Sequence, residues 1–134
     1  MEYTFQRFTE VGKRFEDRIT VTRGRSIGLP TRFYNDNKVS DYKFAVLFYD
    51  KERNAIGIHF TNNADEPGRI AITKSKQEYG GHIPATSFFK ANRINSKKYA
   101  GRYEYKRLGS GESGVSDADA LFVLELKEKV GVAE

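Results

Sequence analysis

Two nine-residue stretches, Thr31-Arg32-Phe33-Tyr34-Asn35-Asp36-Asn37-Lys38-Val39 and Thr86-Ser87-Phe88-Phe89-Lys90-Ala91-Asn92-Arg93-Ile94, resemble each other within one chain of 134 residues. Each follows closely on a proline, has two adjacent aromatic residues near its start and ends on an aliphatic residue. We expect each stretch to form a helix of about two turns, with Thr31 and Thr86 as N-caps. The paired aromatics are expected to anchor both helices in the core.

The similarity extends beyond these helices. The same shift of 55 residues places Phe44 on Tyr99, and upstream Arg18-Ile19-Thr20-Val21-Thr22 matches Arg69-Ile70-Ala71-Ile72-Thr73 if the second copy has four extra residues in its turn. The order of elements is the same in both copies. The chain is therefore predicted to be a tandem duplication of a strand–strand–helix–strand–strand (ββαββ) unit.

Patterns typical of β-strands surround both helices. Alternation of apolar and polar residues predicts half-buried strands, and a continuous apolar run predicts a central one. The segments are Ile19–Val21, Phe44–Tyr49, Ile56–Phe60, Ile70–Ile72, Tyr103–Tyr105 and Phe122–Leu126. The glycine- and serine-rich stretch 109–120 is expected to be a hairpin loop.

These elements predict a mainly β fold with two short helices. One unit spans 18–62 and the other 69–127, and we expect them to interleave their hairpins into a closed β-barrel with pseudo-twofold symmetry. A half of this size would bury little core alone, so 1–134 is predicted to be a single domain. Residues 1–17, with Tyr3 and Phe5, are expected to form an appended element that covers the barrel.

Composition narrows the function classes. The chain has no Cys and only two His residues, His59 and His82, so we expect no thiol chemistry, no metal site and no cofactor. No apolar run approaches the roughly 18 residues of a membrane span, and no secretory signal is visible, which predicts a cytoplasmic protein. Neither Asp50-Lys51-Glu52 nor Ser110-Gly111-Glu112-Ser113-Gly114 has the context of a catalytic motif, so no enzyme is predicted.

Charge is distributed unevenly along the chain. The net charge is +5, but the segment from Arg69 to Arg107 contains ten Lys/Arg and only two acidic residues, Glu78 and Glu104. Such asymmetry favours a surface that binds a polyanion such as nucleic acid. The alternative is a solvated charged surface with no partner.

The segment Arg18–Pro30, with Ile27-Gly28-Leu29-Pro30 before the first helix, and His82-Ile83-Pro84 near the second, resembles the AbrB/SpoVT swapped-hairpin family. The resemblance covers roughly 18–61 and 69–127, and the two-unit arrangement is similar to the MraZ branch. It implies a swapped-hairpin DNA-binding barrel that acts as a transcriptional regulator or an antitoxin. Ser40-Asp41 and Ser96-Lys97 depart from the family's usual Gly-Asp pair before the third strand.

The resemblance also implies which residues grip DNA. Basic residues around the turn between the first two strands, and at the adjoining helix start, correspond to Arg18, Arg23, Arg25, Arg32, Arg69, Lys74 and Lys76. Arg and Lys on such turns can contact successive phosphates of a duplex. Tyr79 is a candidate for stacking on a base. The cations Lys97, Lys98, Arg102, Lys106 and Arg107 either extend a positive stripe or form the solvent face of a strand.

Two other functions stay open at this point. The 13 % aromatic content would also suit a protein that binds single-stranded nucleic acid. A barrel of this kind could instead be an adaptor module that docks a protein partner and never contacts nucleic acid. A homodimer is compatible with any of these functions.

Overall fold

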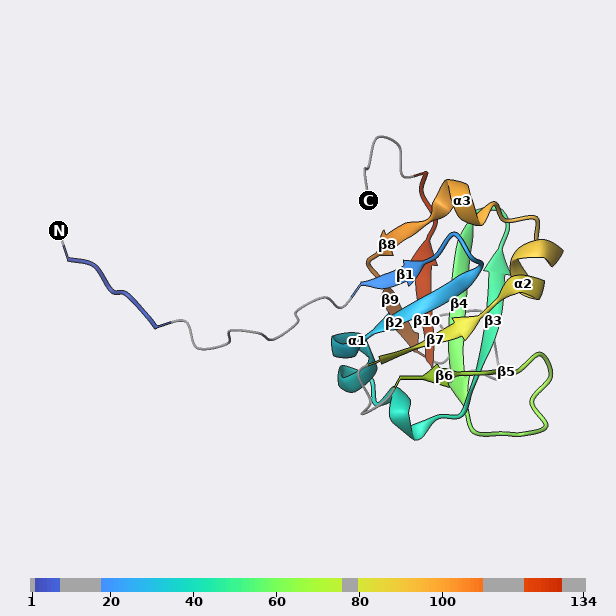
Figure 1. The fold of residues 1–134 in the computed structure, drawn as a ribbon, viewed down its shortest axis with the longest axis horizontal. Coiled ribbons are helices and arrows are strands. Elements are labelled where there is room, and N and C mark those ends of the chain that lie inside the picture. Colours follow the sequence, from blue (N-terminus) through green and yellow to red (C-terminus); the bar gives the residue numbers. More distant parts are fainter. Residues whose placement is uncertain (1, 8–17, 76–79, 110–119, 129–134) are drawn as a thin grey trace.

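The computed structural model describes residues 2–7, 18–75, 80–109 and 120–128, which form a mainly β fold of two antiparallel five-stranded sheets (Figure 1). Sheet A has the spatial order β6 (Thr73–Lys74), β7 (Gly80–Pro84), β2 (Ser26–Pro30), β1 (Ile19–Val21) and β8 (Gly101–Tyr103). Sheet B has the order β5 (Ile70–Ala71), β3 (Phe44–Asp50), β4 (Ala55–Thr61), β10 (Ala120–Glu125) and β9 (Lys106–Gly109). The strands of the two sheets cross each other in Figure 1. The predicted β class is confirmed.

Alternation along the strands separates a buried face from an exposed one. In sheet A, Val21, Ile27 and Ile83 stand opposite one another on adjacent strands, and all three are fully buried. In sheet B, Ile58 and Phe122 form a cross-strand pair that is likewise buried. Residues of both sheets belong to one hydrophobic cluster, so the two sheets share a single core.

The strands of the two sequence copies pair with each other. The hairpin β1–β2 of the first copy has strands of the second copy on both sides, because β1 pairs with β8 and β2 pairs with β7. In sheet B, β5 of the second copy pairs with β3 of the first, and β10 pairs with β4. Each copy therefore depends on the other for many of its ladder hydrogen bonds.

Two short segments carry the chain from one sheet to the other. Ile72 separates β5 in sheet B from β6 in sheet A, and Glu104 and Tyr105 separate β8 in sheet A from β9 in sheet B. Bends of this kind form the corners of orthogonally packed sheets. The hydrogen-bond ladders of the described strands are interrupted at these bends. The described strands therefore form two separate sheets and not one closed barrel.

Both predicted helices are present, but their caps differ from the expectation. α1 spans Thr31–Asp36 and α2 spans Thr86–Ala91. Pro30 and Ala85 occupy the N-cap positions, and neither helix has a side-chain cap hydrogen bond. The proposed N-caps Thr31 and Thr86 are therefore wrong by one residue. The reason is that each helix starts almost directly from the end of a strand, so the threonine already lies in the first turn.

The two helices end in the same way. The side-chain amide of Asn37 donates a hydrogen bond of 3.0 Å to the carbonyl of Phe33, and that of Asn92 donates one of 3.0 Å to the carbonyl of Phe88. The residues that follow, Lys38 and Arg93, both have left-handed backbone, with φ of 51° and 55°. This shared geometry bears out the alignment of the two copies over the helices.

Further along, the copies diverge. The predicted number of two helices is wrong, because a third helix, α3, spans Ser96–Tyr99, where the first copy has only the 3₁₀ turn η1 (Val39–Asp41). The side chain of Asn95 accepts hydrogen bonds from the backbone N–H groups of Lys97 and Lys98 and so caps α3. Tyr99 therefore lies in a helix, although the alignment had placed it in a strand.

The aromatic anchors are not equivalent. Phe33, Tyr34 and Phe89 are fully buried, but Phe88 is only partly buried against the core. At the N-terminus, Tyr3 and Phe5 are 71 % and 88 % exposed, and their rings stack on each other rather than on a sheet. In the described residues 2–7, the predicted cover of the barrel is therefore wrong, because those two aromatics bury no surface against the core.

Candidate nucleic-acid interface

Sheet A and the elements attached to it form a layer without a single carboxylate. The described residues 18–30, 73–75 and 80–103, called the basic layer below, contain nine Lys/Arg and no Asp or Glu. All nine cations are exposed. They are Arg18, Arg23, Arg25, Lys74, Lys90, Arg93, Lys97, Lys98 and Arg102. In contrast, the described residues 44–71, 104–109 and 120–128, which include sheet B, contain six Lys/Arg and seven Asp/Glu.

The outer face of the basic layer is flat and polar. One row of residues in register crosses all five strands and lies next to the buried row of Val21 and Ile27. Its members are Thr73, His82, Gly28, Thr20 and Arg102. Short side chains in the middle of this row leave a shallow hollow of about 440 Å³ over β2, β6 and β7. A ligand can thus reach the sheet between the cations at its edges.

The turn between β1 and β2 carries Arg23 and Arg25 at one end of this face, beside α3 (Figure 1). Two contacts hold the turn in place. Ser96 Oγ donates a hydrogen bond of 2.9 Å to the carbonyl of Arg23, and the N–H of Ala85 donates one of 3.0 Å to the carbonyl of Arg25. The backbone is thus fixed through its carbonyls, and both guanidinium groups are left exposed to solvent.

The second hairpin, formed by β6 and β7, also contacts the other copy of the repeat, at the opposite end of this face. Lys74 Nζ donates a hydrogen bond of 2.9 Å to the carbonyl of Ser40, in the turn η1 of the first copy. Lys74 was predicted to contact DNA, and here its ammonium group is bonded within the protein, although the residue remains exposed. The predicted site residues Lys76 and Tyr79 lie outside the described residues.

The remaining predicted residues already have roles within the fold. Arg32 Nε lies 3.6 Å from a carboxylate oxygen of Asp36 on the exposed side of α1. The Arg69 guanidinium lies 5.7 Å from the centre of the Phe44 ring. These two cations belong to α1 and to the start of β5, so they are not part of the basic layer.

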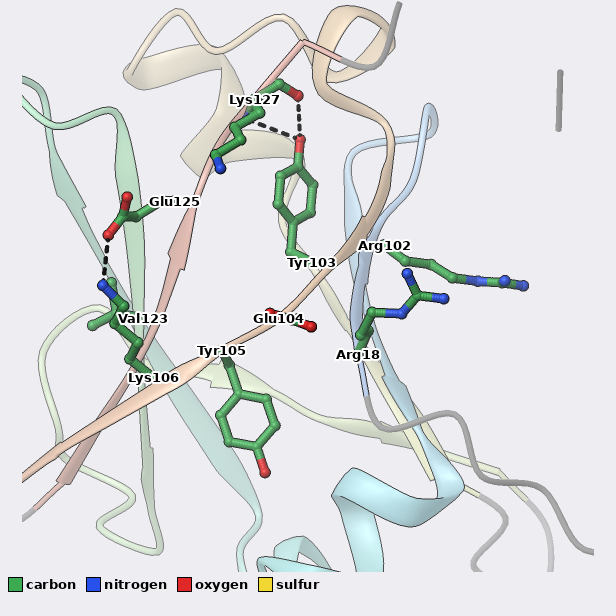
Figure 2. Close-up of a pocket in the computed structure, with 9 residues that line it drawn as sticks. All are labelled: Arg18, Arg102, Tyr103, Glu104, Tyr105, Lys106, Val123, Glu125 and Lys127. Carbon is green, nitrogen blue, oxygen red and sulfur yellow. Dashed lines mark hydrogen bonds and ion pairs between the residues drawn. The ribbon is translucent and has the colours of Figure 1, made fainter. Parts of the chain in front are cut away.

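Arg18 and Arg102 line a hollow of about 440 Å³ at the corner where β8 leaves sheet A (Figure 2). The hollow has mixed charge, because Glu104 and Glu125 also line it, and Lys106 Nζ lies 3.1 Å from Glu125 Oε1. This hydrogen bond, with the positive charge of Lys106, lowers the pKa of the Glu125 carboxyl. The carboxylates make this hollow a poorer anion site than the face of the basic layer.

Sequence reasoning missed part of the positive surface. It assigned no role to Lys90 or Arg93. It offered Lys97 and Lys98 as part of a positive stripe or as the solvent face of a strand, whereas both lie on α3 beside the first hairpin turn. The helix itself was not expected. A signal was nevertheless present, because the stretch 80–103 has five Lys/Arg and no acidic residue.

Other kinds of site find little support in the described residues. They include no group of three or more His, Asp and Glu side chains placed to hold a metal ion. No helix in the described part of the chain is long and apolar enough to cross a membrane.

Comparison with known proteins gives no identification. The chain matches no protein-family model, no curated protein and no solved structure. The site described above therefore rests on the geometry and charge of this chain alone.

Proposed function

We propose that this protein binds duplex DNA through the outer face of the basic layer, as a transcriptional regulator or an antitoxin-like factor and not as an enzyme. The observation that carries the proposal is the charge of the layer, with nine exposed Lys/Arg and no carboxylate in its described residues. Phosphate contacts by Arg and Lys supply most of the affinity of proteins for DNA.

The dimensions of the layer agree with this ligand. The first hairpin turn and the base of the second lie at opposite ends of the ladder between β2 and β7, where Ser26 pairs with Pro84 and Pro30 pairs with Gly80. At roughly 3.4 Å per residue, these ends are about 14 Å apart. That separation is close to the width of the DNA major groove, about 12 Å, so cations at both ends can contact phosphates on either side of a groove.

The distribution of aromatic residues favours a duplex over a single strand. Proteins that bind single strands stack bases on exposed aromatic rings. Among the described residues, the exposed large hydrophobic side chains are Tyr3 and Phe5, which lie outside the basic layer. The partly buried rings of Phe88 and Tyr99 pack against the core. The described part of the layer thus offers phosphate contacts rather than stacking platforms.

The architecture we propose is a swapped-hairpin barrel of the AbrB/SpoVT type with both units in one chain. The exchange of strand partners between the copies and the chain bends at Ile72 and Glu104 support it. In such an arrangement the two hairpin turns are related by a pseudo-twofold axis, and a DNA site with approximate dyad symmetry would match it. In this proposal Arg23 and Arg25 contact one half-site, and Lys74, which ends β6, and Lys76 contact the other.

A salt-dependent binding titration tests the proposal. The protein is titrated with duplex DNA, single-stranded DNA and RNA of equal length at several salt concentrations. We expect preference for the duplex and a linear fall of log K with log salt concentration. The double variant Arg23→Ala/Arg25→Ala should lower the slope by about 1.8, because each lost phosphate contact removes about 0.9.

A matched control removes the same charge from the other layer. Lys51 and Arg53 are exposed residues in the turn between β3 and β4 of sheet B. Lys51→Ala/Arg53→Ala should leave the slope nearly unchanged. If this control weakens binding as much as the turn variant does, the interaction is diffuse attraction to a +5 protein, and the proposed site is wrong. Failure of the wild-type protein to bind any nucleic acid at low salt would leave a protein-docking module as the better proposal.

A further inference from the structure

Basic residues occupy backbone positions that normally favour glycine. The described residues other than glycine that have positive φ are Arg25, Lys38, Asn54 and Arg93, with values of 64°, 51°, 52° and 55°. Left-handed backbone is uncommon outside glycine, and where it does occur Asn and Asp are the favoured residues. Three of these four residues are cations, so the pattern calls for an explanation beyond the turn itself.

The first of these positions lies beside an available glycine. In the turn Arg23-Gly24-Arg25 the left-handed residue is Arg25, whereas Gly24 does not have positive φ. Three-residue hairpin loops place glycine at the left-handed position that closes the loop. The turn thus has a glycine one residue before the place where glycine would relieve strain.

The other two positions follow helices α1 and α2. Lys38 and Arg93 each come directly after the asparagine that caps the end of the helix, and glycine is the most common residue there. The two copies of the repeat have kept a cation at this position, although they differ at most residues around it.

The fold makes no use of these charges. The side chains of Lys38 and Arg93 are exposed, and within the described part of the chain no ion pair, side-chain hydrogen bond or ring contact engages either one. Backbone strain is maintained where the side chain serves a function. A cation that is exposed and unpaired in the described structure is available to a ligand of opposite charge.

Their positions relate both residues to the hairpin turns. Lys38 comes two residues before Ser40, whose carbonyl accepts the hydrogen bond from Lys74. Arg93 comes three residues before Ser96, which binds the carbonyl of Arg23. One left-handed cation therefore lies within three residues of the docking point of each hairpin, and Lys38 also lines a hollow of about 330 Å³ with His59 and Arg107 of sheet B.

We propose that Lys38 and Arg93 are a second pair of phosphate contacts, which extend the DNA site beyond the hairpin turns to both helix ends. This inference rests on the proposed function. It adds that the chain maintains these two contacts against a cost in stability. Removal of the side chains should therefore weaken binding and at the same time make the protein more stable.

The double variant Lys38→Gly/Arg93→Gly tests both halves of the inference. We expect its Tm to rise by about 2–4 °C as left-handed strain is relieved, and its salt slope for duplex DNA to fall by about 1.8. The variant Lys38→Asn/Arg93→Asn, in which asparagine tolerates the same backbone, should show the same loss of slope. Lys51→Ala/Arg53→Ala serves as the control for loss of two charges.

The outcomes separate this inference from the proposed function. If the wild-type protein binds duplex DNA, the Arg23→Ala/Arg25→Ala variant loses slope and both helix-end variants keep the full slope, the contacts proposed here are wrong and the proposed function stands. A decrease in Tm for the glycine variant would overturn the claim of strain. Absence of duplex binding by the wild-type protein would overturn both proposals.

Discussion

Ser96 Oγ donates a hydrogen bond of 2.9 Å to the backbone carbonyl of Arg23, which lies 73 residues earlier in the sequence. Ser96 is only 5 % exposed and is the buried polar residue of the described chain. The bond joins the first hairpin turn to the first residue of α3, so it fixes the distance between Arg23 and the lysines of that helix. A side chain from one copy of the repeat thus positions the candidate interface of the other.

Replacement of Ser96 should loosen this turn. Ser96→Ala leaves the partly buried carbonyl of Arg23 without this donor, and we expect a loss of about 1 kcal/mol in the free energy of unfolding. Urea denaturation measures it. Ser40→Ala is the control, since the contact at Ser40 uses the backbone carbonyl, which alanine retains. An equal loss in both variants would show that the hydroxyl of Ser96 has no special role.

The aromatic anchors of the two helices should differ in their contribution to stability. Phe33 is fully buried, and its ring centre lies 4.8 Å from that of Tyr105 and 5.2 Å from that of Phe122. Phe33→Ala should cost about 3–5 kcal/mol, whereas Phe88→Ala, at a partly buried position, should cost about half as much. Thermal and denaturant unfolding of both variants provide the comparison, and equal costs would contradict the packing described here.

Gly80 is a position where a side chain cannot be accommodated. Its φ is 114°, and a Cβ atom there would lie 2.5 Å from the carbonyl oxygen of Leu29 on the neighbouring strand. Gly80→Ala should destabilise the protein by about 3 kcal/mol through backbone strain and this clash. Gly24→Ala, where the nearest atom would be 3.9 Å away, should stay within about 0.5 kcal/mol of the wild type. Similar unfolding midpoints for the two variants would contradict the close approach of β7 to β2.

Stability should fall at alkaline pH, and Tyr103 should contribute to this fall. Burial raises the pKa of the Tyr103 phenol above its usual value of about 10, and its single O–H proton is shared between the carbonyl oxygens of Tyr99 and Lys127, at 2.6 and 2.8 Å. Between these two pKa values the unfolded chain loses a proton that the folded protein keeps, so the free energy of unfolding decreases as the pH rises above 10.

Tyr103→Phe checks this assignment. The variant should be less stable at neutral pH by about 1 kcal/mol, because the hydrogen bond from the phenol to these partly buried carbonyls is lost. It should also lose less stability than the wild type between pH 8 and 11. The measurement is denaturant unfolding at both pH values. A decline as steep as that of the wild type would mean that other groups control the alkaline transition.

The exchange of strands predicts that neither half of the chain folds alone. A fragment of residues 1–64 lacks β7 and β8, the partners of β2 and β1. When the chain is divided near Asp65, we expect both fragments to show no cooperative unfolding by circular dichroism, and an equimolar mixture to regain β structure. Cooperative unfolding of the isolated 1–64 fragment would contradict the interleaved arrangement.

The sequence was sufficient to predict the elements whose side chains alternate or repeat. The buried positions Ile19, Val21, Ile56 and Ile58 follow directly from the period of two along a strand. The starts of α1 and α2 were expected at Thr31 and Thr86, although both helices end three residues before the predicted Val39 and Ile94. These features depend on local chemistry, so a local pattern contains them. The acid-poor stretch 80–103 is likewise visible in the sequence, whereas the lack of carboxylates across the whole basic layer is visible only once the strand order is known.

The features that sequence reasoning missed depend on distant contacts. The repeat alignment placed Tyr99 at the start of a strand and so hid α3, although Asn95 is a local N-cap signal; a distant contact, with the turn at Arg23, also holds this helix. Phe88 looks equivalent to Phe33 in the alignment, yet only Phe33 meets the ring cluster built from Tyr105 and Phe122. Lys74 was assigned to a ligand, although a carbonyl 34 residues away accepts its hydrogen bond.

The pairing of Ile19 with Tyr103 has a consequence for the newly made chain as it leaves the ribosome. Until Tyr103 emerges, β1 lacks one neighbouring strand, and until β7 emerges, β2 exposes its free edge as well. Unpaired strand edges and uncovered apolar residues are the features that promote aggregation of nascent proteins. Translation that stalls in the middle of this message would therefore leave a partial chain whose exposed strand edges favour aggregation.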